Sequence, residues 1–230
     1  MDRRLLLPSA VALLLLGACG DDEPFADLSA EEVLAAGQEA ADQAGSVYVV
    51  GDAAVQGQDT ALDLRLGDGR ATGSVTVEGA ELEVRVDDET VVFAGSSAFW
   101  ERSGASAAAA EQLDGRFVDA SGQPGVEEGF GALLDRQGLL EAFFGELEGG
   151  DFTKAGVTEV DGVEAFALED ASGGRLLVST GEQPYPLRLE DEEVGTVDFR
   201  EWDEPVEVDV PADAVPIDQL QSELQEQPQG

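Results

Sequence analysis

The chain has 230 residues, with 12 basic and 50 acidic side chains and a formal net charge of −38. This charge excludes nucleic acid as a reasonable partner and repels the protein body from a bare anionic membrane. Because the chain has no histidine, Ser-His-Asp triads, Cys-His dyads and histidine-containing zinc sites cannot be built, and we predict no catalytic residue, metal site or cofactor.

The first residues have the features of an export signal. Met1-Asp2-Arg3-Arg4 is a short basic start, residues 5–16 are apolar, and the small residues Gly17 and Ala18 precede Cys19. This order is typical of a cleaved secretory peptide. The apolar run is too short to span a bilayer, which needs about 20 apolar residues.

The end of that run, Leu16-Gly17-Ala18-Cys19, resembles the lipobox of prolipoproteins. The resemblance implies cleavage between Ala18 and Cys19, and acyl chains such as palmitate on Cys19. We therefore expect residues 1–18 to be a signal peptide and the mature chain to be held at the extracytoplasmic face of the cell membrane through Cys19. A simple secretory peptide with a chance cysteine is the alternative.

A tether and a helix follow. Residues 19–28 are acidic and contain Pro24, which predicts a flexible tether. Ser29-Ala30-Glu31-Glu32 has the form of a capping box, and the pattern predicts a helix to about Ala44.

Alternating residues and short polar turns then predict an antiparallel meander with one dry face. The predicted strands are residues 47–55, 62–66, 75–78, 82–86 and 91–94, the last leading to Phe99 and Trp100.

Helical patterns occupy the middle of the chain. The pattern of residues 105–113 predicts a short helix. Residues 126–147 predict a strongly apolar helix, which Gly138 either bends or divides into two abutting helices. Strands resume at Phe152, with Asp161-Gly162 as a hairpin turn, and the last predicted strand is 206–210. We expect residues 221–230 to be a disordered tail.

The numbers of strands and helices bear on the shape of the sheet. Ten strands make a sheet roughly 48 Å wide, whereas each helix covers a strip of about 10 Å. Three helices cannot cover an open face of that width, so the sheet must curl around them. These areas leave two possibilities open. The curled sheet either encloses an apolar hollow or is filled by its own side chains.

Several segments resemble the LppX/LprG type of lipoprotein, relatives of the LolA-like lipoprotein carriers. They are residues 82–102, 156–163, 184–187 and 199–211. The resemblance covers about residues 29–220. It implies an α+β fold in which a strongly curved antiparallel β-sheet, a half-barrel of about ten strands, wraps around two or three helices. It also implies a cavity for acyl chains, because members of this family carry or present lipids at the cell envelope. The acidity and low aromatic content of the chain depart from the family and leave the ligand open.

The resemblance also implies residues for that cavity. Its roof would be formed by Phe130, Leu133, Leu134, Leu140, Phe143 and Phe144, and Phe93 and Phe99 would line its floor. For each of these residues, ordinary core packing is the alternative.

Three functions are compatible with these features. The first is an anchored lipoprotein that binds a lipid or acylated ligand for transport or presentation, with a transport partner in the envelope. The second is a non-enzymatic sensor or scaffold that acts through a protein partner. The third is an enzyme such as a glycosidase with paired carboxylates, which we set aside because no nucleophile is paired with a base. We interpret the paired acidic residues as parts of solvated turns. These pairs are Asp21/Asp22, Asp87/Asp88 and Glu192/Glu193.

Overall fold

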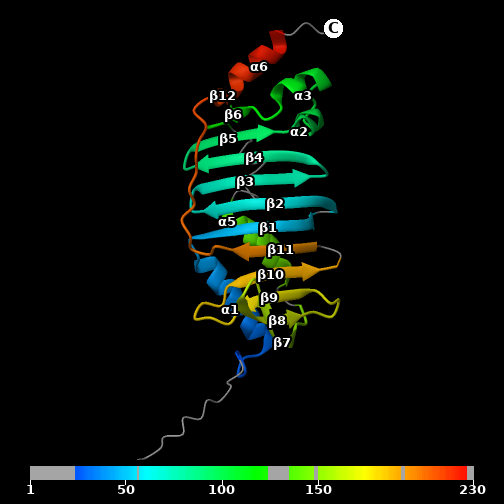
Figure 1. The fold of residues 1–230 in the computed structure, drawn as a ribbon, viewed down its shortest axis with the longest axis vertical. Helices are drawn as coiled ribbons and strands as arrows, with labels where there is room; N and C mark the ends of the chain where they lie inside the picture. The colour runs from blue at the N-terminus through cyan, green and yellow to red at the C-terminus, as the bar shows by residue number, and fades with distance from the viewer. Residues whose placement is uncertain (1–23, 56, 124–134, 148–149, 193–194, 227–230) are drawn as a thin grey trace, which may run out of the picture.

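The computed structural model describes residues 24–55, 57–123, 135–147, 150–192 and 195–226. Within these residues, twelve strands form one open sheet in the order β12-β6-β5-β4-β3-β2-β1-β11-β10-β9-β8-β7. The strands lie one above another like the rungs of a ladder, with β7 at one end and β6 and β12 at the other (Figure 1). The large, curved and unclosed sheet confirms the predicted fold class, with twelve described strands in place of about ten.

The sheet consists of two meanders joined at a seam. The first meander contains β1 (Ser46–Val55), β2 (Gln58–Gly67), β3 (Arg70–Val77), β4 (Ala80–Asp87), β5 (Thr90–Gly95) and β6 (Phe117–Asp119). The second contains β7 (Thr153–Val160), β8 (Val163–Glu169), β9 (Arg175–Ser179), β10 (Pro186–Asp191) and β11 (Gly195–Arg200). At the seam β1 pairs with β11, from Tyr48 opposite Arg200 to Ala53 opposite Gly195. These pairings are antiparallel, whereas the short β12 (Val215–Pro216) runs parallel to β6.

The described helices are α1 (Ala30–Gln43), α2 (Ser97–Arg102), α3 (Ala107–Leu113), α5 (Arg136–Phe144), the 3-10 helix η1 (Gly145–Leu147) and α6 (Ile217–Glu226). In Figure 1, α1 and α5 lie behind the middle and the β7 end of the sheet, whereas α2, α3 and α6 gather at the opposite end. The predicted capping box of α1 is present, with Ser29 as N-cap and Glu32 as its partner.

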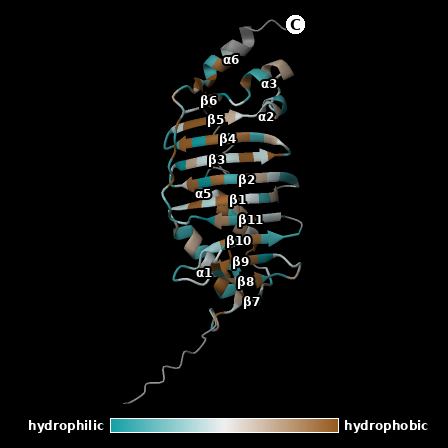
Figure 2. Ribbon diagram, in the orientation of Figure 1, coloured by the Kyte–Doolittle hydropathy of each residue, from teal (hydrophilic) through white to brown (hydrophobic). Residues whose placement is uncertain are grey.

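Alternation along the strands determines which face of the sheet is buried. In β2, Leu62, Leu64 and Leu66 are almost completely buried, whereas Asp63 and Arg65 between them are not. The same alternation appears as changing colours along several strands in Figure 2. The inward side chains of both meanders join α1 and α5 in one hydrophobic core. A smaller cluster of Val160, Ala165, Ala167 and Leu177 lies at the β7 end.

One turn and one close approach between strands depend on specific backbone conformations. The predicted hairpin at Asp161-Gly162 is confirmed: both residues have positive φ, 49° and 86°, and Val160 pairs with Val163 across the turn. Within β3, Gly73 has φ 139°, and a Cβ placed there would lie 1.9 Å from the carbonyl oxygen of Asp63. Only glycine lets β2 and β3 pair so closely at this point.

The predicted strand 91–94 lies within β5, whereas one other strand prediction was wrong. Phe99 and Trp100 lie in α2, because the Ser96 side chain accepts a hydrogen bond from the Phe99 N–H and starts a helix there. Residues 206–210 form no strand, although they alternate. They belong to the connection from β11 to β12, which runs along the ends of the strands rather than beside one of them (Figure 1).

The ends of the predicted domain differ in extent from the sequence prediction. The helix α6 continues to Glu226, so residues 221–226 of the segment that we assigned to a tail are helical. At the other end, Phe25 and Leu28 of the predicted tether pack against the core. The apolar side chains of Phe25 and Leu28 supply contacts that a polar linker would lack.

Candidate functional site

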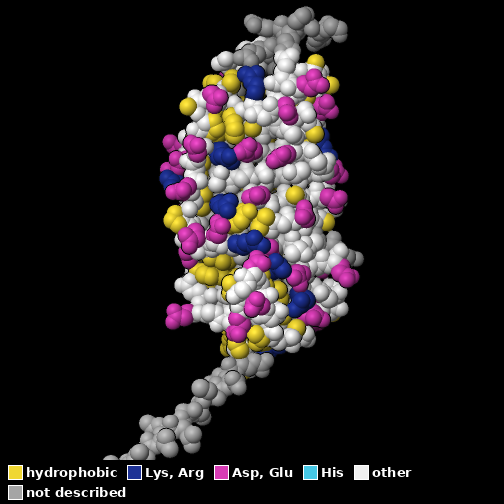
Figure 3. All heavy atoms as spheres, in the orientation of Figure 1, with side chains coloured by type: hydrophobic (Ala, Val, Ile, Leu, Met, Phe, Trp, Pro, Cys, Tyr) yellow, Lys and Arg dark blue, Asp and Glu magenta, His cyan; other side chains and the backbone are white. Residues whose placement is uncertain are grey.

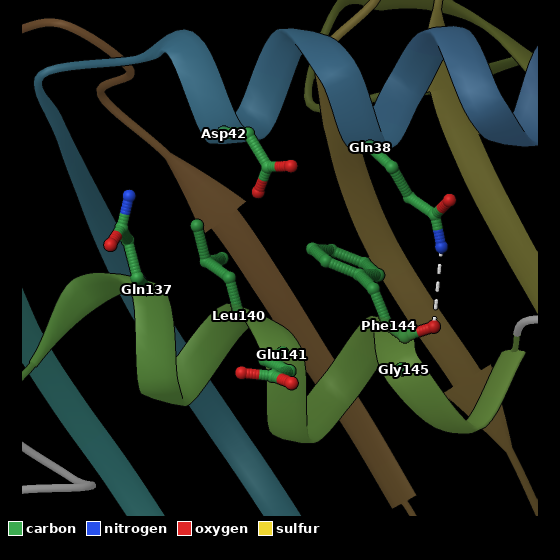
Figure 4. Close-up of a pocket in the computed structure, with 7 residues that line it drawn as sticks. All are labelled: Gln38, Asp42, Gln137, Leu140, Glu141, Phe144 and Gly145. Carbon is green, nitrogen blue, oxygen red and sulfur yellow. Dashed lines mark hydrogen bonds between the residues drawn. The ribbon is translucent and has the colours of Figure 1, made fainter.

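A pocket of about 430 Å³ lies between α1 and α5, behind the sheet in the view of Figure 1. Its described lining residues are Gln38, Asp42, Gln137, Leu140, Glu141, Phe144 and Gly145. Figure 4 shows that the Gln38 and Asp42 side chains point from α1 toward α5, and that Leu140 and Phe144 point from α5 back toward α1. The pocket therefore belongs to the gap between two helices that the sheet holds side by side.

Local hydrogen bonds fix the start of each of these helices. The Ser29 N–H donates to the Glu32 carboxylate at 2.7 Å, and this hydrogen bond lowers the pKa of Glu32. In α5 the Asp135 side chain is the N-cap and accepts from the Gly138 N–H at 2.8 Å. Gly138 thus lies in the first turn of α5, where a small residue is easily accommodated.

Two side chains bridge the helices on either side of the gap. The Gln38 Nε2 donates to the Phe144 carbonyl oxygen at 3.2 Å, as the dashed line in Figure 4 marks. The Arg136 Nη1 donates to the Ala41 carbonyl oxygen at 3.1 Å, and Arg136 is only 6% exposed. These bonds hold α1 and α5 at a fixed spacing, so the pocket is preformed.

The floor of the pocket is apolar. Leu140 and Phe144 are 2% and 4% exposed, and the Phe144 ring packs on Phe199 of β11 with centroids 5.1 Å apart. Phe143 contacts the same Phe199 ring, with centroids 5.7 Å apart. The floor is therefore continuous with the core at the β1/β11 seam.

The walls of the pocket are polar. Asp42 on α1 and Glu141 on α5 contribute carboxylates, and Gln38 and Gln137 contribute carboxamides. A hydrocarbon floor below hydrogen-bonding walls suits an amphiphile, whose apolar part packs on Leu140 and Phe144 while its polar part stays at the opening. The two carboxylates oppose an anionic head group.

The structure separates the predicted cavity residues into groups. Leu140 and Phe144 line the pocket, and Phe143 packs beside them. Phe93 and Phe99 lie at the β5 end, where their ring centroids are 6.3 Å apart and Trp100 completes the cluster. They are not among the described residues that line the gap between α1 and α5. Phe130, Leu133 and Leu134 lie outside the described residues, as do Ala18 and Cys19, so these assignments stay predictions.

A second pocket, of about 580 Å³, was not predicted from the sequence. It lies at one side of the sheet, where the β1/β2, β3/β4 and β10/β11 connections meet, and contains the carboxylates of Asp52, Asp59, Glu78 and Glu192. Among the described residues, no three Asp, Glu or Cys side chains gather closely enough to hold a metal ion. Only the sheet order brings these loops together, so the sequence carries no local signal for this pocket.

The fold of the chain is found in solved structures, although no family model and no curated protein matches the sequence. LprF from Mycobacterium bovis is similar over 80% of this chain and 97% of that chain, with a TM-score of 0.50 and 15% sequence identity. The chain has the LprF fold. At this identity the likeness concerns the fold alone, and it confirms the resemblance to LppX/LprG-type lipoproteins at that level.

Two further structures are similar with lower scores. The match to LppX from Mycobacterium tuberculosis, described as a lipoprotein, covers 78% of this chain and 98% of that chain, at 13% identity and a TM-score of 0.49. The MucA/MucB complex of Pseudomonas aeruginosa matches at 17% identity, with 84% of this chain and 60% of that chain covered and a TM-score of 0.34.

Proposed function

We propose that the protein is an envelope lipoprotein, anchored through acylated Cys19, that binds the acyl chain of a lipid or acylated ligand and performs no catalysis. The observation that carries this proposal is the preformed gap between α1 and α5, which is floored by Leu140 and Phe144 where these helices pack against the sheet. The LprF fold supports it at the level of architecture.

The energetics of this function come from removing hydrocarbon from water. Each buried CH₂ contributes about 0.8 kcal/mol, and a pocket of about 430 Å³ lies in the lower part of the range for small-ligand sites, roughly 300–1,000 Å³. One acyl chain or part of one is therefore the expected guest. Transport or presentation would follow when a partner in the envelope takes over the exposed polar part.

The membrane association in this proposal is covalent. Among the described residues no helix is both long and apolar enough to cross a bilayer, and the sequence before Cys19 has the lipobox pattern. Mass spectrometry of the full-length chain expressed in a bacterial host should show a diacylglyceryl group on Cys19. Cys19→Ser should abolish the modification and release the protein from the membrane fraction, and an unmodified wild-type chain would refute the anchor.

Ligand binding is tested on the unlipidated Cys19→Ser protein with a fluorescent fatty acid. Gln137 is an exposed residue that lines the pocket, so Gln137→Trp should fill the gap without disturbing the core. We expect its affinity for the probe to fall at least about tenfold, as for a loss of about 1.4 kcal/mol. The matched control is Gln43→Trp, because Gln43 is exposed on α1 and is not a described lining residue. Absence of both co-purified lipid and probe binding would refute this function.

A second candidate, a sensor or scaffold acting through a protein partner, is favoured by one observation. Inward side chains such as Val49, Leu64 and Phe199 are 0–1% exposed, so that part of the core is filled by the protein's own residues. This candidate predicts a protein that purifies without lipid and keeps its function in Gln137→Trp. The same measurements therefore decide between the two.

A further inference from the structure

The segment that follows the predicted acylation site is tied to the edge of the sheet by Lys154, the one lysine of the chain. The Lys154 Nζ donates to the carbonyl oxygens of Phe25 at 2.7 Å, Leu28 at 3.0 Å and Ala26 at 3.4 Å. The ammonium also lies 5.4 Å from the centre of the Phe166 ring, within the range of a cation–π contact. The ammonium group of Lys154 therefore has three carbonyl oxygens and one aromatic ring as partners.

The Phe25 side chain makes the second connection. Its ring meets Phe166 of β8 edge-on, with centroids 5.7 Å apart and planes at 85°. Phe166 itself is 1% exposed, so Phe25 is attached to the core and not only to the surface. The chain before α1 is therefore held against β7 and β8 from Phe25 onward.

These contacts limit the distance between the anchor and the sheet. Six residue steps separate Cys19 from Phe25, and a fully extended chain spans at most about 3.6 Å for each, or roughly 22 Å in all. If the contacts of Lys154 and Phe25 were lost, residues 25–28 would lengthen the connection by up to about 14 Å. The contacts of Lys154 and Phe25 together thus set how far the β7 edge can be from an acylated Cys19.

The same edge carries exposed apolar side chains. Among the described residues, the exposed large hydrophobic residues are Val157 on β7, at 45%, and Val163 on β8, at 46%. Val157 pairs with Phe166 of the main core, and Val163 pairs with Val160 of the smaller cluster, so the two valines lie on opposite faces of the hairpin. A partner that covers one face of the sheet would meet only one of them, whereas a surface that meets the sheet edge-on can reach both.

We propose that the β7–β8 edge is the membrane-facing end of the protein, with Val157 and Val163 in contact with the surface of the bilayer that holds Cys19. Hydrophobic side chains are visible at this end of the molecule, the lower end in Figure 3, among the acidic ones. Acidic neighbours such as Glu159 and Glu164 keep the edge at the head-group level and prevent deeper insertion. The inference rests on the proposed acylation of Cys19.

The opposite end supplies the reference position for a test. Nine strand spacings of about 4.8 Å separate β7 from β5, so the α2–α3 end lies roughly 40 Å away along the sheet. Once acylated, Cys19 has no free thiol, and since the chain has one cysteine, a cysteine introduced elsewhere is the one reactive thiol. Full-length Val163→Cys and Glu111→Cys, the latter exposed on α3, can each be labelled with bimane in vesicles of phosphatidylcholine with a head-group spin label.

We expect the spin label to quench bimane at position 163 at least about threefold more strongly than at position 111, because contact quenching does not act over roughly 40 Å. In the 163 background, the double variant Lys154→Met, Phe25→Ser should weaken the quenching at least about twofold, because it removes both contacts and so lengthens the tether. Arg102→Met, which removes the same charge at the far end, should leave it unchanged.

The outcomes separate this inference from the function on which it rests. Equal quenching at both positions of an acylated protein would overturn the orientation and leave the anchor intact. A mass spectrum without acyl groups would overturn both. Energy transfer between labelled copies at position 163, without lipid quenching, would replace the bilayer by a second copy of the chain as the partner of this edge.

Discussion

The phenolic hydroxyl of Tyr185 donates a hydrogen bond to the carboxylate of Asp203, and this pair links the β9–β10 loop to the segment after β11. The Tyr185 ring stacks on Trp202 with centroids 5.0 Å apart, and Asp203 also accepts from the Gly45 N–H at 2.7 Å. Burial, with the hydrogen bond to Asp203 as a second cause, raises the pKa of Tyr185 to about 12. The hydrogen bonds from Tyr185 and Gly45 lower the pKa of Asp203.

The first prediction concerns the pH dependence of stability at this pair. A raised tyrosine pKa gives stability that is present below the unfolded pKa, about 10, and lost as the pH rises toward about 12. A lowered Asp203 pKa gives stability that is present above about 3.9 and lost as the pH falls through the folded value. Tyr185→Phe should flatten both changes and cost about 1 kcal/mol at pH 7 in urea unfolding.

Tyr48→Phe is the control for that experiment. The pKa of Tyr48 is also raised by burial, followed by the effect of Asp63, so the variant should reduce the alkaline loss of stability. It should leave the acid loss unchanged, since Tyr48 is not a partner that lowers the pKa of Asp203. An acid profile of Tyr185→Phe identical to the wild type would contradict the assignment.

The second prediction concerns Arg136 between α1 and α5. Its buried Nε has no hydrogen-bond partner among the described residues, and Asp68, 3.6 Å from its Nη2, has a side chain that is 86% exposed. A buried charge with incomplete partners is replaced by an apolar group of similar shape at little cost. We expect Arg136→Met to cost about 1 kcal/mol and Arg136→Ala, which leaves a cavity, about 3 kcal/mol in denaturant unfolding.

Asp68→Asn is the control for the arginine. Because the Asp68 side chain is mostly in solvent, we expect a change within about 0.5 kcal/mol. If Arg136→Met were as costly as Arg136→Ala, hydrogen bonding to the Ala41 carbonyl rather than packing would be the main contribution of the arginine.

The third prediction concerns Gly73 in β3. A methyl group there would meet the Asp63 carbonyl oxygen at 1.9 Å, in a backbone conformation with φ 139° that other residues rarely adopt. Gly73→Ala should destabilise the protein by more than about 3 kcal/mol, measured by thermal and urea unfolding. Gly79→Ala is the matched control: φ is 81°, but no atom of the part of the chain that the structure describes lies within 4 Å of the new Cβ, and we expect a cost of about 1 kcal/mol.

The fourth prediction concerns the carboxylates of the pocket and rests on the proposed function. Asp42 lines the pocket from α1 and Glu141 lines it from α5. The double variant Asp42→Asn, Glu141→Gln should bind an anionic fluorescent fatty acid about fivefold more tightly, as expected for roughly 1 kcal/mol of removed repulsion. Its affinity for the corresponding uncharged alcohol should stay the same. An equal gain for both probes would show that the carboxylates act through the shape of the pocket instead.

The predictable part of the fold is the part that local patterns encode. The capping box at Ser29, the period-two strands and the Asp161-Gly162 turn each depend on neighbours in sequence, and each is present in the structure. The strand predicted for residues 91–94 is part of β5, and Phe99 and Trp100, which follow it, are helical because the Ser96 side chain caps α2. Residues 206–210 alternate like a strand but run along the ends of the strands instead of beside one of them (Figure 1).

The site was harder to predict because it depends on contacts between distant residues. The apolar floor at Leu140 and Phe144 could be found, since the resemblance pointed to that helix. The polar walls could not, because Gln38 and Phe144 are 106 residues apart and only the packing of α1 on α5 makes them neighbours. Phe93 and Phe99 have a different role: their rings pack α2 on the sheet at the β5 end.

The pairing of β1 with β11 has a consequence for biosynthesis. The first meander can form as soon as its strands have been synthesised, but the second partner of β1 is β11, the last long strand of the chain. Until residues 195–200 arrive, β1 offers an unsatisfied edge to other nascent chains. A pairing across so many residues also forms slowly, so a chaperone that covers the β1 edge would protect the chain from aggregation until β11 pairs with it.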